Sequence, residues 1–94
     1  MRSLIWTGAF TRDAKRLLKK RSVTDQELEE ILRQMEDDPF DPLLETHKLK
    51  GKLSGSWACS LGYDYRIVFD FVTQPGSKTK DLLLLAIGTH DEVY

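Results

Sequence analysis

The fold of this chain is decided by the sequence LLLLAIGTHDEVY, which spans residues 82–94. Its first six residues, Leu82 to Ile87, are all apolar, and such a continuous run predicts a buried strand near the centre of a sheet. The following segment, Gly88–His90, carries a histidine to the rim of that sheet. Because histidine can give and take protons near pH 7, we expect acid–base chemistry where this strand ends.

Two further strands are predicted before this one, at residues 56–61 and 63–72. The second of them alternates with the period of two that is typical of a strand. Its two faces carry Tyr65, Ile67, Phe69 and Phe71 on one side and Asp64, Arg66, Val68 and Asp70 on the other. The last strand is predicted at residues 80–87, after a turn at 74–79. Short connections make these three strands antiparallel neighbours.

The N-terminal part of the chain predicts a short strand at residues 3–7 and then two helices. The first helix has an apolar stripe formed by Phe10, Ala14, Leu17 and Leu18. The second helix begins with a capping box of Thr24 and Glu27, and Pro39 prevents its continuation. The short link between the helices indicates an antiparallel hairpin. Such a hairpin would cover one face of the sheet in a two-layer α+β domain.

The composition fits one small domain that comprises residues 1–94. Hydrophobic residues make up 40% of the chain, which is enough for a folded core. No apolar run approaches the roughly 20 residues that span a bilayer, and no secretion signal is found. The single cysteine, Cys59, cannot form an internal disulfide and is expected to be buried. These features predict a cytoplasmic protein with no membrane association.

The formal net charge of −1 conceals a strong segregation of charge along the chain. Residues 12–21 are basic and residues 25–45 are acidic, and then Lys48, Lys50 and Lys52 restore positive charge. We interpret the charged runs as solvated helix faces, although the local basic patches could still meet phosphate. The histidines and acids lack the spacing of a metal site, so we expect no metal and no cofactor.

Chemistry is expected where three segments of the chain meet. Residues 39–53 form a predicted loop that carries a histidine and three lysines, and a long loop in so small a domain is often functional. Arg66 lies on the predicted sheet, where it either pairs with Asp64 or Asp70 or holds a phosphate by a bidentate contact. His90 ends the neighbouring strand, so the arginine and this histidine would converge on one concavity.

Several motifs of the chain together resemble one known family. They are HKLKG at 47–51, GSW at 55–57, DYRIVF at 64–69 and AIGTHDEVY at 86–94. This set is similar to the RelE/ParE superfamily of bacterial toxins, and most similar to the RelE/YafQ-type messenger-RNA interferases of type II toxin–antitoxin systems. The resemblance covers nearly the whole chain. It implies a RelE-like fold with an N-terminal strand, a helical hairpin and three antiparallel strands.

The resemblance also implies cleavage of messenger RNA, usually on the ribosome and without a metal ion. The RNA 2′-hydroxyl attacks the adjacent phosphate, so the protein must help to remove one proton, stabilise a crowded anion and protonate the leaving 5′-oxygen. The implied roles are Arg66 for the phosphate, His90 as general acid, Tyr94 to stack on a base, and His47 and Asp64 as candidate bases. The residues that would hold the RNA backbone are Lys48, Lys50 and Lys52.

Other functions and partners follow from the same resemblance. ParE-like relatives share the fold and inhibit DNA gyrase, and an inactive relative would only bind an antitoxin. A further histidine of the YafQ branch is replaced here by the segment 60–62, Ser-Leu-Gly, so position alone does not identify the general base. The implied protein partner is a cognate antitoxin, through which the complex would bind its promoter DNA. The basic stripe at residues 12–21 would contact either the antitoxin or ribosomal RNA.

Overall fold

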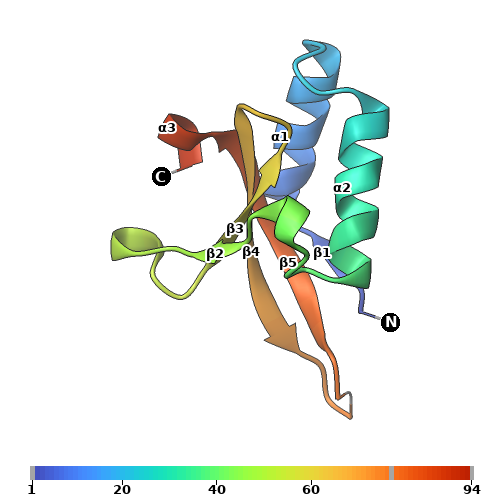
Figure 1. Ribbon diagram of the computed structural model, residues 1–94, viewed down its shortest axis with the longest axis vertical. Helices are drawn as coiled ribbons and strands as arrows, with labels where there is room; N and C mark the ends of the chain where they lie inside the picture. Colours follow the sequence, from blue (N-terminus) through green and yellow to red (C-terminus); the bar gives the residue numbers. More distant parts are fainter. Residues whose placement is uncertain (1, 77, 94) are drawn as a thin grey trace.

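The computed structural model describes residues 2–76 and 78–93. Over these residues the chain forms a strand, two helices, four further strands and a short C-terminal helix (Figure 1). The bounds of the elements are β1 (Leu4–Trp6), α1 (Gly8–Lys19), α2 (Asp25–Asp37), the 3₁₀ turn η1 (Pro42–Leu44), β2 (His47–Lys48), the 3₁₀ turn η2 (Gly51–Leu53), β3 (Trp57–Leu61), β4 (Tyr65–Thr73), β5 (Lys80–Thr89) and α3 (His90–Val93).

The strands form one sheet with the order β1-β5-β4-β3-β2. The predicted antiparallel pairing of the last three strands is confirmed, because β4 pairs with β3 on one side and with β5 on the other. β1 pairs with β5 in parallel and lies at one edge of the sheet, and β2 pairs with β3 at the other edge. β5 therefore has a neighbour on each side, as its apolar run predicted.

The two long helices cover one face of the sheet, which confirms the α+β prediction (Figure 1). The predicted capping box of α2 is present: Thr24 Oγ1 accepts a hydrogen bond from the Glu27 N–H at 3.1 Å, and Glu27 Oε1 accepts one from the Thr24 N–H at 3.0 Å. Buried side chains of the helices and the sheet form the main core, and they include Phe10, Ala14, Leu17, Leu28, Met35, Ile67, Phe69, Leu82 and Leu84. None of the helices in the described part of the chain is long and apolar enough to cross a membrane.

The single cysteine is part of this main core, as predicted. Cys59 is fully buried, and its Sγ atom lies 3.7 Å from Met35 Sδ. Burial raises the pKa of the Cys59 thiol to about 12, because the charged thiolate would lose its solvation. The thiol is therefore protonated at neutral pH and acts as a small apolar group.

The opposite face of the sheet carries a second, smaller apolar cluster. Its buried members are Leu49, Ala58 and Val68, and Leu53, Leu85, Ala86 and Val93 pack against them. Val93 belongs to α3, whereas Leu49 and Leu53 belong to the segment that contains β2 and η2. Burial of these side chains therefore holds two segments, far apart in sequence, against the same face of the sheet (Figure 1).

Three predictions of local structure are corrected. Residues 39–53 contain β2 and two 3₁₀ turns, because a two-residue strand is too short for its alternation to be visible in the sequence. β4 begins at Tyr65 rather than at residue 63, so Asp64 lies in the preceding turn and not on the face of a strand. The last strand continues to Thr89, and α3 follows it.

A bulge in β5 explains how a run of apolar residues serves both faces of the sheet. Val68 pairs with Ala86, whereas the next residue, Phe69, pairs with Leu84, so Leu85 has no partner in β4. One extra residue of this kind changes which side chains point to each face. Leu84 and Ile87 consequently both reach the core under the helices, although their spacing in the sequence is odd.

Candidate active site

Arg66 lies on the face of the sheet that α1 and α2 do not cover. Its neighbour Ile67 belongs to the core under the helices, and Val68 belongs to the second cluster, so the alternation of β4 turns Arg66 to the second face. The Cα of Arg66 pairs with Gly88 of β5. His90 follows Gly88 by two residues and comes directly after β5, so Arg66 on β4 and His90 lie near the same end of two neighbouring strands.

Backbone carbonyls hold the guanidinium of Arg66. Its Nη1 donates hydrogen bonds to the carbonyl oxygens of Tyr65, at 2.9 Å, and Tyr63, at 3.3 Å. In the described part of the chain no ion pair joins Arg66 to Asp64 or Asp70, so the first of the two alternatives stated for this arginine is not found in the structure. Because neither of its acceptors is a carboxylate, the guanidinium keeps its positive charge for an anionic ligand.

His90 is the first residue of α3, and a second capping box sets its position. Thr89 Oγ1 accepts a hydrogen bond from the Glu92 N–H at 3.3 Å, and Glu92 Oε1 accepts one from the Thr89 N–H at 2.9 Å. The imidazole is 67% exposed, and its Nδ1 lies 3.6 Å from Asp91 Oδ1. The reciprocal bonds fix the backbone on both sides of His90 and leave its ring accessible from solvent.

The charge of Glu92 is stabilised by the bonds that it makes. The hydrogen bond from the backbone N–H of Thr89 lowers the pKa of the Glu92 carboxyl, and the Thr89 side chain and the charge of Arg16 act in the same direction. Arg16 Nη1 lies 3.8 Å from Glu92 Oε2. Glu92 is therefore ionised at neutral pH and is a good acceptor for the backbone.

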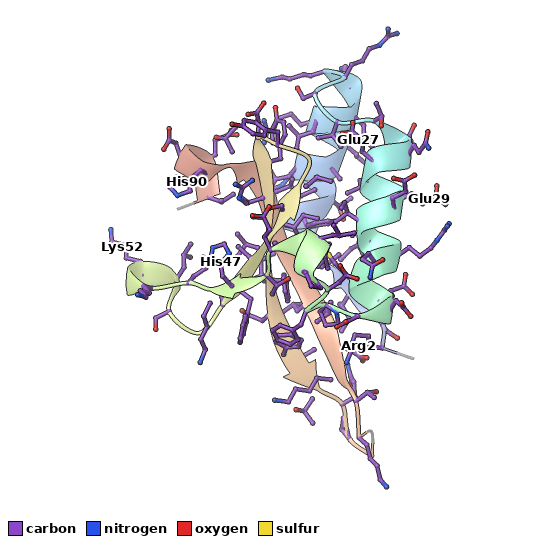
Figure 2. All side chains as sticks on the ribbon, viewed as in Figure 1. Arg2, Glu27, Glu29, His47, Lys52 and His90 are labelled. Atoms are coloured by element: carbon purple, nitrogen blue, oxygen red, sulfur yellow. The ribbon has the colours of Figure 1, made fainter. Side chains whose placement is uncertain are left out.

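His47 lies on the same face of the sheet as Arg66. Its Cα pairs with Ala58, a member of the second cluster, and residues directly opposite in a sheet share a face. Figure 2 shows His47 and His90 on the side of the sheet away from α1 and α2. The Nδ1 of His47 donates a hydrogen bond to the carbonyl oxygen of Glu45 at 3.0 Å. A carbonyl only accepts, so in the neutral ring the acceptor nitrogen is Nε2, which suits a general base.

The predicted RNA-binding lysines line one groove but differ in what their side chains contact. A groove of about 440 Å³ is lined by His47, Lys48, Leu49, Lys50, Lys52 and Leu53. Lys48 pairs with Trp57 across the strands, and its Nζ lies 5.6 Å from the centre of the Trp57 ring, a cation–π distance. Lys50 and Lys52 are exposed at and next to η2. Lys48 is therefore held partly toward the helix-covered face, and the other two lysines extend from the loop.

Of the two remaining predicted site residues, the structure describes Asp64. Asp64 is exposed in the turn before β4, two residues before Arg66. Tyr94 lies outside the described residues. Among residues 2–76 and 78–93, no group of three or more His, Cys, Asp or Glu side chains could hold a metal ion. The second face therefore carries one guanidinium and two imidazoles, groups that can bind an anion and transfer protons.

Two features of this face were missed in the sequence. The capping box of Thr89 and Glu92 has a clear signal, the pattern Thr-x-x-Glu, and this pattern was sufficient to predict α3. Glu45 had no such signal, because it ends an acidic run. Glu45 Oε1 accepts a hydrogen bond from the buried Ser60 hydroxyl at 3.2 Å, and Ser60 is the other cross-strand partner of Arg66. Glu45 thus links the β2 segment to the strand beside Arg66.

Comparison with known proteins identifies relatives of the chain. Residues 2–94 match the YafQ toxin family, which is described as a bacterial toxin of type II toxin–antitoxin systems. No curated protein sequence matches the chain significantly.

Solved structures of bacterial toxins share the fold over the full length of the chain. A copper-bound mutant toxin from Helicobacter pylori is 28% identical, with 100% of both chains covered and a TM-score of 0.77. YafQ from E. coli is 20% identical, covers 100% of this chain and 99% of its own, and has a TM-score of 0.76. A chain of the E. coli DinJ–YafQ toxin–antitoxin complex is 21% identical over 99% of this chain and 97% of its own, with a TM-score of 0.74.

Proposed function

This chain belongs to the YafQ family of bacterial type II toxin–antitoxin toxins, and from that premise we propose that it is a metal-independent endoribonuclease that cleaves messenger RNA on the ribosome. The observation that carries the proposal is the register of β4 and β5, in which Arg66 lies opposite Gly88, two residues before His90. A guanidinium on β4 and an imidazole that directly follows β5 suit a reaction at a single phosphate, because one can hold the anion while the other transfers a proton.

In the proposed reaction the RNA 2′-hydroxyl oxygen forms a bond to the adjacent phosphorus, and the bond from phosphorus to the 5′-oxygen breaks. Arg66 neutralises the additional negative charge of the crowded phosphate. Protonated His90 gives its proton to the leaving 5′-oxygen. His47 takes the proton of the 2′-hydroxyl through Nε2, and Asp64 is the second candidate for this role. The products are a 2′,3′-cyclic phosphate and a free 5′-hydroxyl.

Binding of the RNA is proposed to use the basic loop around η2. Lys48, Lys50 and Lys52 line the groove beside His47 and would contact phosphates of the backbone, with an affinity that falls as salt concentration rises. Tyr94 would stack on a base near the scissile linkage. We propose that the protein acts in the cytoplasm, where translated messenger RNA is found.

Substitution of His90 and of Arg66 tests the reaction directly. We expect His90→Ala and Arg66→Ala each to slow RNA cleavage in a translating extract by about 10²–10⁴-fold, because each removes a group that acts in the transition state. The matched control is Glu29→Ala, which removes an exposed ion pair with Arg33, 2.8 Å long, on the far side of the molecule. Mapping of RNA ends would show the cyclic phosphate, and cleavage by purified ribosomes and this protein should persist after transition metals are removed with a chelator that leaves Mg²⁺ in solution.

The same experiment distinguishes the alternative functions. If both variants cut RNA at the parent rate, the proposed mechanism is wrong. If the parent protein arrests growth without cutting RNA and inhibits supercoiling by DNA gyrase, the chain acts as a ParE-like inhibitor. If it neither cuts RNA nor arrests growth, it is an inactive relative.

We propose a small antitoxin protein as the partner of this chain. The support comes from family membership and from the similar toxin solved with its antitoxin, DinJ. The basic stripe at residues 12–21, which includes Arg12, Lys15, Lys19 and Lys20, would attract an acidic segment of such a partner. Promoter DNA would be bound indirectly, through the antitoxin. Co-purification of the product of the adjacent reading frame would test this assignment.

A further inference from the structure

The two peptide N–H groups that flank Gly88 are each held by a carboxylate. Ile87 N donates a hydrogen bond to Asp13 Oδ2 at 3.0 Å, and Thr89 N donates one to Glu92 Oε1 at 2.9 Å. Asp13 belongs to α1, more than seventy positions away in the sequence, and Glu92 belongs to α3. Gly88 itself lies opposite Arg66. The backbone of β5 is therefore held on both sides of Gly88, just before α3, which we call the catalytic turn because it begins with His90.

The hydrogen bond to Asp13 takes the place of strand pairing at the part of β5 that β1 does not reach. β1 pairs with β5 only as far as Leu84, because the chain turns into α1 after Trp6. Beyond that point an N–H of β5 would have no partner, and an unpaired, partly buried N–H is costly. At Ile87 the carboxylate of Asp13 accepts the hydrogen bond of this N–H.

Arg16 connects the two carboxylates. Its Nη2 lies 3.6 Å from Asp13 Oδ1, and its Nη1 lies 3.8 Å from Glu92 Oε2. The side chains of Asp13, Arg16 and Glu92 are 26%, 39% and 47% exposed, so the group lies at the surface rather than in the core. We call these three residues the clamp. Each of its carboxylates uses one oxygen for the backbone and the other for the guanidinium.

The helical turn that bears His90 needs such support. A helix of four residues is not stable alone, because its nucleation cost exceeds what a single turn regains. The turn packs closely on the strand: a Cβ atom at Gly88 would lie 2.9 Å from Val93 Cγ1 and 3.0 Å from Glu92 Cβ. Glu92 thus holds the turn through its hydrogen bonds with Thr89, and the absence of a side chain at Gly88 leaves room for the turn.

We propose that the clamp of Asp13, Arg16 and Glu92 positions the catalytic turn, so that Glu92 is a positioning residue for His90. This inference deepens the proposed nuclease function and rests on it for the effect on cleavage. Its structural part stands independently, since it concerns the order of Thr89 and His90 in the free protein.

The test compares Glu92→Ala with Glu92→Gln in the full-length protein. Glutamine can still accept the hydrogen bond from Thr89 N but loses the charge that faces Arg16. We expect Glu92→Ala to lower kcat for RNA cleavage about tenfold with KM nearly unchanged, because loss of a cap of this kind typically shifts a local equilibrium by about that factor. Glu92→Gln should restore kcat to within about threefold of the parent, and Arg16→Gln should lower it only about twofold, since exposed ion pairs contribute little.

A second measurement does not require any nuclease activity. NMR of the free protein should show faster exchange of the Thr89 amide hydrogen and altered His90 ring signals in Glu92→Ala, with parent-like spectra in Glu92→Gln and in the control Glu29→Ala. In a His90→Ala background, adding Glu92→Ala should cause little further loss of cleavage, because both act on the same step.

The outcomes separate the two proposals. Parent-like amide exchange and parent-like kcat in Glu92→Ala would overturn the clamp. Additive losses in the double variant would overturn the positioning role and would show that Glu92 acts independently of His90. If the parent protein does not cut RNA but the NMR differences are present, the clamp is supported and the proposed nuclease function is wrong.

Discussion

The two faces of the sheet are built by different means. The face under α1 and α2 is filled by large apolar side chains such as Phe10, Phe69 and Met35, all fully buried. Among the described residues the opposite face has a cluster with only three buried members, and the segments around it are held by hydrogen bonds that Glu45 and Glu92 accept. Stability is concentrated on one face, and the chemical groups Arg66, His47 and His90 lie on the other. We conclude that substitutions can separate the two properties.

The largest expected effect on stability comes from the helix-covered face. Phe69→Ala should lower the free energy of unfolding by about 3–5 kcal/mol, because it removes a fully buried ring and leaves a cavity. Leu49→Ala, in the second cluster, should lower it by only about 2 kcal/mol, since Leu49 is 8% exposed and its surroundings can collapse. Urea denaturation of both variants measures the difference. Equal losses would mean that the two faces contribute alike.

An intermediate effect is expected where β5 meets α3. Gly88→Ala would place a methyl group 2.9 Å from Val93 Cγ1 and 3.0 Å from Glu92 Cβ, so the turn must move. Overpacking of this kind typically costs about 1–3 kcal/mol, but here the displaced turn is at the surface, and we expect the low end of that range. RNA cleavage should fall more than stability does. A variant that loses stability but keeps full cleavage would contradict this separation.

The smallest expected effect is a dependence on pH of the stability of the catalytic turn. The bond from Thr89 lowers the pKa of Glu92 in the folded protein. At pH values above the ordinary pKa of a glutamate the ionised Glu92 therefore stabilises the turn. This stabilisation is lost as the pH falls through the lowered pKa of Glu92 in the folded protein. An NMR titration of the Thr89 amide should show a transition below the usual glutamate range that is absent in Glu92→Gln. A transition in the usual range would show that the bond is not maintained in solution.

The helix-covered face was largely predictable from the sequence, whereas the other face was predictable only in part. The periodicity of Phe10, Ala14 and Leu17 and the alternation of β4 depend on many residues, so they survive local exceptions. β2 has only two residues and is held by pairing with β3, which is a tertiary effect with no local pattern. The side-chain partners of Arg66 were also beyond prediction, because backbone carbonyls carry no sequence signal.

The candidate site was likewise predictable only in part. The motif around His90 placed the histidine at the end of the strand next to Arg66, and the register of β4 and β5 agrees with that placement. The clamp joins residue 13 to residue 87, and nothing in the spacing of the acids distinguished Asp13 from the other charged residues of α1. Such long-range contacts become visible only when the fold is known.

The lengths of the outermost strands have a consequence for solubility. β1 has three residues and β2 has two, so neither outer strand offers a long row of unpaired backbone groups to another molecule. Long, flat outer strands are templates for cross-β association, and short ones flanked by lysine discourage it. The same brevity that hid β2 from sequence analysis therefore protects the protein against aggregation through its sheet.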